Sequence, residues 1–520
     1  MSDIAITFAI LLVVVIAFVS NRIPVGLVAI GASLALYFTG VLDLTQALAG
    51  FGDPAVIFIA TLFVVSEGLD ASGVTTWAGQ ELIARVGDSR TRLIVLMLLL
   101  VAGLTALISV NGAVAALLPV IVVIGVRLGR SPSQLLMPLV FGAHAGSMLA
   151  LTGTPVNVIV SEAAATYGGR PFGFFEFALV GIPLVAGTIV IVLVLGERLL
   201  PSRKPRGLPT DFSEHARILI EQYRLDDALG LISRTSGVAE VVIPPRSEFV
   251  GDTVFPGMVT DSGDLVILAI QRKGEDLGPG EATLAVGDVL LLRGAWAALD
   301  ETLDDPNVLV VDSPEQVRRQ TIPLGLGARE AIVVLGAMVV LLATGVVPSV
   351  VAGLLAAGAM VLLRVVTVDG AYRAINWTTV VLVAGMIPLS TAMTLTGAAD
   401  QVADALVGVV RNAGPYALLA GLFAITAVFG QLISNMATAL IVIPIAVAAA
   451  VELGVSPQPV LMSVTVAAAA SFLTPVATPV NMMVMGPGGY RFGDYWKLGL
   501  PLLALSFAVA VFLVPVFWPL

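Results

Sequence analysis

Thr154-Pro155-Val156-Asn157 and Thr478-Pro479-Val480-Asn481 are the same four residues, placed 324 positions apart, and each lies inside a long apolar run. Proline has no backbone N–H and its ring clashes with the preceding helical turn, so it kinks or breaks a helix that contains it. The two stretches therefore predict two interrupted membrane helices. We expect substrate and coupling ions to bind at these interruptions.

The composition is that of a membrane protein. Hydrophobic residues make up 58% of the chain and charged residues 12%, with a mean hydropathy of +1.01. A soluble domain carries about 25% charged residues, and many apolar runs here reach the roughly 20 residues that cross a bilayer. The chain contains no cysteine, which excludes disulfides and thiolate metal sites. The first apolar run follows no basic segment, so we expect it to be a retained helix.

The charge is concentrated in one polar insert. Residues 201–317 hold 10 Lys/Arg and 20 Asp/Glu, whereas the remainder holds 16 of each, so the net charge of −10 comes from this segment. Nucleic-acid binding needs basic surface, and an acidic insert argues against that partner. A basic linker at 201–207, a helix at 212–229 and short strand-like runs predict a small cytoplasmic α+β domain. The runs lie at 239–243, 264–270, 288–292 and 307–311.

The apolar segments of the first half predict both complete and incomplete spans. We expect helices at 4–20, 25–42, 55–73 and 177–199, an interfacial helix at 75–88, and a broken helix over 132–168. Two arms, 93–108 and 113–126, flank the polar tip Ser109-Val110-Asn111-Gly112. At 1.5 Å per residue each arm spans about 24 Å or less, short of the ~30 Å hydrocarbon core. They predict a re-entrant hairpin whose tip lies near the midplane.

The second half repeats this plan at a nearly constant offset. Ser66 and Gly73 match Ser390 and Gly397 at 324, and Ser109 matches Ser434 at 325. The fold class we expect is a polytopic α-helical membrane protein with two inverted repeats, each of five spanning helices plus a re-entrant hairpin. The expected domains are 1–200, the cytoplasmic insert 201–325, and 326–520. This topology puts both termini outside and 14 of the 16 Lys/Arg beyond the insert on the cytoplasmic side, as the positive-inside rule demands.

The tips and breaks carry the candidate binding groups. Hydroxyl, amide and carbonyl oxygens suit Na⁺, and exposed N–H groups at helix N-termini attract anions. Two such clusters would hold two cations that flank an anion. The alternative is that these polar residues only join helices. The substrate-binding candidates are Ser109, Asn111, Thr154, Asn157, Ser434, Asn435, Thr478 and Asn481, and the Na⁺ candidates are Ser109, Asn111, Thr152, Gly153, Asn157, Ser434, Asn435, Thr438, Thr474 and Asn481.

His144 lies about two turns before the first break. An ionisable residue inside a membrane segment is a functional suspect, and His144 is a possible proton site. The other interpretation is a neutral, hydrogen-bonded core histidine. No Lys or Arg lies deep in an expected membrane segment. An anionic substrate would therefore be compensated by helix ends and bound cations.

With Gly153-Thr-Pro-Val-Asn157 and Ser434-Asn435, the chain resembles the divalent-anion/sodium symporter family of the ion-transporter superfamily. The insert, with 240–247 and 284–292, is similar to the TrkA-C (RCK C-terminal) regulatory domain. The resemblance implies an elevator-type homodimer in a bacterial inner membrane. It also implies sulfate-like anions or di- and tricarboxylates as substrates, Na⁺ as the coupling ion and no other cofactor. A small molecule or nucleotide would bind the cytoplasmic domain. The first tip differs from the family's Ser-Asn-Thr at Val110, and the second at Met436.

Other functions remain open at this stage. A Na⁺/H⁺ antiporter or an arsenite-type permease would share the fold, and His144 favours proton coupling. A ligand-gated channel would explain a regulatory domain, but the Thr-Val-Gly-Tyr-Gly filter of potassium channels is absent from the sequence. The sequence contains no phosphate-binding G-x-x-x-x-G-K-[ST], no H-E-x-x-H and no G-x-S-x-G. We therefore expect a transporter rather than an enzyme.

Overall fold

The computed structural model describes most of the chain in two compact units. The described residues are 2–20, 22–86, 89–127, 131–167, 169–203, 236–260, 264–272, 275–278, 280–295, 298–299, 306–310, 327–410 and 414–520. One unit is helical and comprises Met1–Leu69, Ala78–Leu208 and Arg329–Leu520. The other comprises Asp70–Trp77 and Pro209–Ala328, and its described part is rich in strands.

The first half of the helical unit contains the first expected hairpin and the first expected break. Its elements are α1 (Asp3–Ser20), α2 (Val25–Phe38), α3 (Leu44–Leu48), η1 (Ala49–Gly52), α4 (Pro54–Ala71), α5 (Val74–Val86), α6 (Arg90–Leu107), α7 (Val110–Arg127), η2 (Pro132–Gln134), α8 (Leu136–Gly146), η3 (Leu151–Gly153), α9 (Pro155–Thr166) and α10 (Ala178–Leu199). The hairpin turns at Ser109, between α6 and α7. The expected broken helix is α8, a short 3-10 turn and α9.

Two expectations about helix length were wrong. The second helix ends at Phe38 rather than 42, because Gly40 adopts a positive φ of 76°, a conformation that terminates the helix. The hairpin arms are 18 residues each rather than 16 and 14. At 1.5 Å per residue such an arm reaches about 27 Å, and α6 is long enough to count among the membrane-spanning candidates.

The second half has the same order of elements. It contains α14 (Ala328–Thr344), α15 (Ser349–Leu362), α16 (Val368–Ala374), α17 (Trp377–Thr396), α18 (Ala398–Val410), α19 (Pro415–Leu432), α20 (Asn435–Leu453), α21 (Pro457–Ala469), η5 (Pro475–Ala477), α22 (Pro479–Met485), η6 (Phe492–Asp494), α23 (Tyr495–Ala508), the π-helical η7 (Val509–Leu513) and α24 (Val514–Phe517). The second hairpin turns at Ser434 and the second break separates α21 from α22. Eight helices in the described chain are long and apolar enough to cross a membrane.

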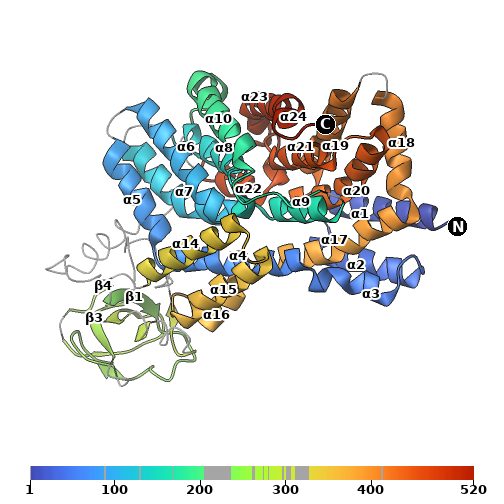
Figure 1. The fold of residues 1–520 in the computed structure, drawn as a ribbon. Helices are drawn as coiled ribbons and strands as arrows, with labels where there is room; N and C mark the ends of the chain where they lie inside the picture. Colours follow the sequence, from blue (N-terminus) through green and yellow to red (C-terminus); the bar gives the residue numbers. More distant parts are fainter. Residues whose placement is uncertain are drawn as a thin grey trace. The chain divides into compact units, whose positions relative to one another are not determined.

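The segments that follow the two breaks exchange partners between the halves. In the first half α6, α8 and α10 lie side by side (Figure 1), and in the second α21 packs against α19 and α20. After its break, α9 packs against α20 and α21 of the second half. In the same way, α22 packs against α7 and α8 of the first half. Each break therefore delivers polar residues of one half to helices of the other.

The strand-rich unit is built from antiparallel pairs. Its strands are β1 (Ser236–Val242), β2 (Thr253–Val254), β3 (Leu265–Arg272), β4 (Glu275–Asp276), β5 (Ala282–Thr283), β6 (Val289–Ala295) and β7 (Leu309–Val310). One sheet has the order β4-β3-β6-β1-β7 and the other pairs β2 with β5. Alternate residues such as Val241, Ile267 and Leu292 form its apolar core. The four expected strand runs correspond to β1, β3, β6 and β7. The helix expected at 212–229 lies outside the described residues.

Candidate functional site

The first break is held by the side chain of Asn157. Its Nδ2 donates to the carbonyl oxygens of Ser147 (2.9 Å) and Ala150 (2.8 Å), two acceptors freed where α8 ends. Thr154 caps α9, and Pro155 occupies the first helical position, where its missing N–H costs nothing. Asn157 is fully buried. The local sequence thus explains the break: proline starts the new helix and asparagine satisfies the end of the old one.

The second break repeats the asparagine bonds of the first. Asn481 Nδ2 donates to the carbonyl oxygens of Ser471 (2.9 Å) and Thr474 (2.9 Å). All three residues lie 324 positions after their counterparts in the first break. Asn481 is also fully buried, and Thr478 caps α22. The repeat that the sequence indicates therefore extends to the hydrogen bonds.

Glycines permit close approach to the backbone at both breaks. A Cβ on Gly153 would lie 2.1 Å from the carbonyl oxygen of Ser147. A Cβ on Gly181 would lie 2.2 Å from that of Met148, and one on Gly499 would lie 2.3 Å from that of Phe472. Real Cβ atoms do not come this close, so α10 and α23 can pack on the breaks only with glycine at these positions.

Each hairpin tip begins a helix with a serine cap. Ser109 Oγ accepts from the N–H of Gly112 (3.1 Å), and Ser434 Oγ accepts from that of Ala437 (3.3 Å). The tips then diverge. In the second, Asn435 Oδ1 accepts a hydrogen bond from Ser471 Oγ at 2.5 Å. The first tip has Val110 at the matching position, so no such amide bond forms there.

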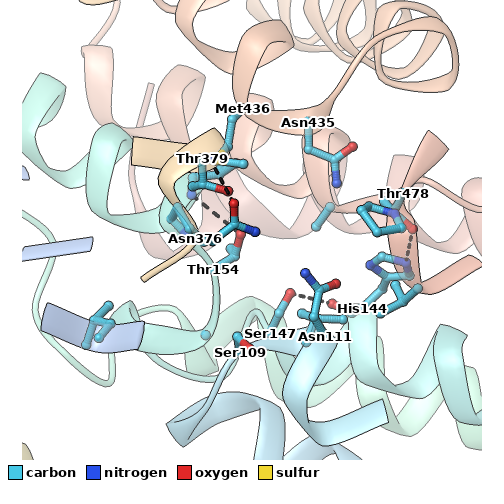
Figure 2. Close-up of a pocket in the computed structure, with 18 of the residues that line it drawn as sticks. Ser109, Asn111, His144, Ser147, Thr154, Asn376, Thr379, Asn435, Met436 and Thr478 are labelled. Carbon is cyan, nitrogen blue, oxygen red and sulfur yellow. Dashed lines mark hydrogen bonds between the residues drawn. The ribbon is translucent and has the colours of Figure 1, made fainter. Parts of the chain in front are cut away.

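Tips and breaks surround one cavity of about 170 Å³. Figure 2 shows Ser109, Asn111 and Ser147 on one side of it, and Asn435 and Met436 across from them. Of the expected site residues, the structure brings together around this cavity Ser109, Asn111, His144, Thr152, Gly153, Thr154, Ser434, Asn435 and Thr478. None of the described lining residues is Asp, Glu, Lys or Arg. His144 is the one titratable side chain among those lining residues.

Four expected residues do not line the cavity. Asn157 and Asn481 brace the breaks behind it, and Thr438 is fully buried in α20. Thr474 donates from Oγ1 to the carbonyl oxygen of Gln431 (3.3 Å). Within the described chain these side chains hold the backbone around the cavity and do not form the surface of the cavity.

Sequence reasoning missed three polar residues of the lining. Ser147 lies 324 positions before Ser471, so the repeat itself could have identified it. Asn376 caps α17 by accepting from the N–H of Thr379 (3.1 Å), and both residues face the cavity (Figure 2). They stand at the start of α17, where an ordinary helix cap is the simplest explanation of their sequence.

His144 joins the two halves. Its Nε2 lies 3.3 Å from Asn481 Oδ1 and 3.3 Å from Thr478 Oγ1, both in the second half. The imidazole packs edge-on against Phe472, with ring centroids 6.0 Å apart. It is only 4% exposed.

The first half has no equivalent of this contact. Asn157 Oδ1, Thr438 Oγ1 and Ser463 Oγ are the buried side-chain oxygens of the described chain that have no hydrogen-bond partner. A buried acceptor without a partner costs about 1–3 kcal/mol. Asn157 Oδ1 therefore calls for a partner that the side chains do not supply.

Helix N-termini give the cavity its electrostatic character. The first residues of α7, α9 and α20 line it, namely Val110, Pro155 and Asn435, and so does Pro479 of the short α22. Unsatisfied N–H groups and the helix dipole make such ends partially positive, and partial charge of this kind attracts anions.

Comparisons with known proteins agree with this architecture. The profile of the citrate transporter family, CitMHS, matches residues 15–467. The chain belongs to the citrate transporter family. A relative over the full length, the "Uncharacterized transporter YfbS" of Escherichia coli (strain K12), is 30% identical across 98% of this chain and 98% of its own. The citrate transporter family member described here is therefore a multi-pass membrane transporter.

Two further similarities are more distant. "Sodium/sulfate cotransporter 1" of Chlamydomonas reinhardtii is 25% identical over 57% of this chain and 34% of its own length. The crystal structure of the YdaH transporter of Alcanivorax borkumensis aligns with a TM-score of 0.49 and 13% identity, covering 94% of this chain and 90% of that chain. The family and the algal relative are both described as transporters.

Proposed function

We propose that this protein is a secondary active transporter that couples Na⁺ movement to the uptake of a small anion such as sulfate or a di- or tricarboxylate. The observation that carries the proposal is the cavity itself. Helix N-termini converge on it, hydroxyl and amide groups line it, and none of its described lining residues is a fixed charge. An anion would be held by N–H groups and dipoles, and co-bound cations would neutralise it.

The size of the cavity supports a small substrate. Sites for drug-sized ligands measure about 300–1,000 Å³, whereas this one measures about 170 Å³. The family name and the sodium/sulfate cotransporter relatives favour citrate-like and sulfate-like anions respectively. The substrate-binding residues in this proposal are Ser109, Asn111, Thr154, Ser434, Asn435 and Thr478, and Asn157 and Asn481 hold the breaks in place.

The donor set fits Na⁺. Hard cations take oxygen ligands from hydroxyl, amide and carbonyl groups, and these are the polar groups at tips and breaks. Asn157 Oδ1 is a buried oxygen with no partner among the described residues, which is what a cation ligand looks like without its ion. Thr152 and Gly153, which line the cavity near the first break, would contribute through carbonyl or hydroxyl oxygens.

Alternating access follows from the repeated architecture. Two halves related by inversion, with broken helices that exchange partners, suit a transport unit that moves the site across the membrane. In this proposal the protein is an elevator-type homodimer in a bacterial inner membrane, with both termini outside and residues 201–325 cytoplasmic. The strand-rich unit would serve as a TrkA-C-like regulatory domain for a small molecule or nucleotide. Deletion of 208–320 should leave transport intact and remove its response to that ligand.

His144 favours a second candidate, a proton-coupled antiporter or arsenite-type permease. It is the titratable side chain of the described lining. A proteoliposome uptake panel decides between the two. Sulfate, succinate, citrate and arsenite are each offered under a Na⁺ gradient or a pH gradient. Strict Na⁺ dependence with one of the anions supports the symporter, and uptake driven only by the pH gradient overturns it.

A further inference from the structure

The two breaks have the same internal hydrogen bonds, but their amide oxygens meet different surroundings. Asn481 Oδ1 has the imidazole of His144 at 3.3 Å, whereas Asn157 Oδ1 has no hydrogen-bond partner. Both side chains are fully buried. The two halves therefore differ in the group that lies beside the amide oxygen.

The orientation of both amides is fixed by their nitrogens. Each Nδ2 donates to two carbonyl oxygens of its own break, so neither amide can flip without losing both bonds. Asn481 Oδ1 meets His144 on α8 of the opposite half. We place Asn157 Oδ1 beside α21 by the same relationship, because α9 packs against α21 as α22 packs against α8.

His144 has a non-polar counterpart. The residue 324 positions after it on α21 is Ala468, which is fully buried. Where α8 presents an imidazole to Asn481, α21 presents at the matching position only a methyl group. Because of this exchange of partners, Asn481 Oδ1 faces a polar side chain of the other half, whereas Asn157 Oδ1 faces none.

The imidazole also excludes a cation from the second half. Asn481 Oδ1 can only accept, so the bond requires that Nε2 carries the hydrogen. That N–H points at the oxygen that a cation would need, and Thr478 Oγ1 lies at the same 3.3 Å from Nε2. A metal ion at this place would face an N–H donor instead of a lone pair.

We propose that His144 takes the place of a cation in the second half, and that one Na⁺ per chain binds in the first half, where Asn157 Oδ1 has no hydrogen-bond partner, and is coupled to transport. The proposal rests on the Na⁺-coupled function above and makes it more specific. His144 is a positioning residue: it replaces a second cation and ties α8 to α22.

The test measures Na⁺ binding directly, apart from transport. Purified full-length protein in detergent is titrated with ²²Na⁺, and the unfolding temperature is followed against NaCl with choline chloride as the ionic-strength control. Wild type should bind one Na⁺ per chain with a Hill coefficient near one, and NaCl should raise its unfolding temperature. Asn157→Ala should lose both effects.

Two matched variants change which break asparagine has an imidazole beside it. His144→Ala should bind a second Na⁺ per chain, since it opens Asn481 Oδ1. Ala468→His should bind none, because its imidazole faces Asn157 Oδ1. His144→Ala adds no volume, so it keeps the proposal testable if the buried histidine at 468 prevents folding.

Two Na⁺ per wild-type chain would overturn the proposal and leave the Na⁺-coupled function standing. So would one Na⁺ per chain in both wild type and His144→Ala, or Na⁺ binding that survives Asn157→Ala. If wild type binds no Na⁺ and its unfolding temperature does not change with NaCl, Asn157 Oδ1 is not a cation ligand. The Na⁺-coupled function then fails as well.

Discussion

Asn157 and Asn481 each donate two hydrogen bonds across a break in their own half of the chain, to carbonyls placed 10 and 7 residues earlier in both cases. Neither residue lines the cavity, yet both fix the backbone that does. The shape of the binding site therefore depends on two side chains behind it.

Replacing either asparagine should stop transport. Asn157→Ala or Asn481→Ala removes both hydrogen bonds that the amide donates across its break, at about 1–3 kcal/mol in total, and lets the helix starts at 155 and 479 shift. We expect uptake to fall roughly tenfold or more, measured in proteoliposomes, with the protein still folded by size-exclusion chromatography. Ser463→Ala is the control, because Ser463 is equally buried and its Oγ bonds nothing in the described chain. Wild-type uptake by both asparagine variants would show that the braces are dispensable.

Adding a methyl group at a glycine of the breaks should destabilise the helical unit. Gly153→Ala and Gly499→Ala would each push a Cβ against a backbone oxygen, at 2.1 Å and 2.3 Å, and forced packing of this kind costs about 1–3 kcal/mol. The measurement is the unfolding temperature in detergent. Gly103→Ala on α6 serves for comparison, since nothing lies within 4 Å of its Cβ. Equal unfolding temperatures for all three variants would contradict the close approach.

An ion pair helps to hold the segment after α10 in place, together with hydrogen bonds to Ser133. Arg203 Nη1 donates to Asp494 Oδ2 at 2.7 Å and to the carbonyl oxygen of Gly489 at 2.8 Å. The Asp494 side chain is only 5% exposed. Arg203→Ala leaves this carboxylate with the N–H of Arg491 at 2.8 Å and with Lys497 at 3.5 Å, and should cost about 1–3 kcal/mol.

A double-mutant cycle checks this ion pair. Asp494→Asn in the Arg203→Ala background removes the unpaired charge, so the double variant should lose less than the sum of the two single losses. Thermal unfolding in detergent gives all four values. Strict additivity would mean that the pair contributes nothing.

The strand-rich unit should lose stability in acid through Asp288. Arg272 donates to both carboxylate oxygens at 2.7 Å and holds the pKa of Asp288 below its ordinary value, helped by the N–H of Ala285. Because the folded-state pKa is depressed, this stabilisation is complete above the unfolded value of about 3.9. It is lost as the pH falls through the folded-state pKa.

Asp288→Asn tests that pH dependence. It should destabilise β3 and β6 by about 1–3 kcal/mol at pH 7, and the deficit relative to wild type should shrink as the pH falls below about 4. Hydrogen exchange of these two strands in the full chain measures both. A deficit that is unchanged between pH 7 and pH 3 would rule out the carboxylate as its source.

The sequence by itself determined the local features of this protein. Proline and glycine inside apolar runs located both breaks, because these residues act on the backbone at their own positions. Serine before an apolar helix located both tips, and the constant offset paired the halves. Short β-rich runs between Gly, Pro and Asp turns placed β1, β3, β6 and β7. Helix ends that depend on a single turn, as at Gly40, were less well predicted.

Only the tertiary structure decided which half of the chain the helix after each break packs against. Two similar halves offer α9 and α22 similar apolar surfaces, and local sequence carries no information on which of them is chosen. Packing resolved this by exchange, so His144 met Asn481 337 residues away, while Asn157 met α21, where Ala468 has no polar group. Whether a buried oxygen gains a partner depends on the side chain that a distant helix places beside it. That is why the inequality of the two halves, and the role we propose for His144, came from the fold rather than from the repeat.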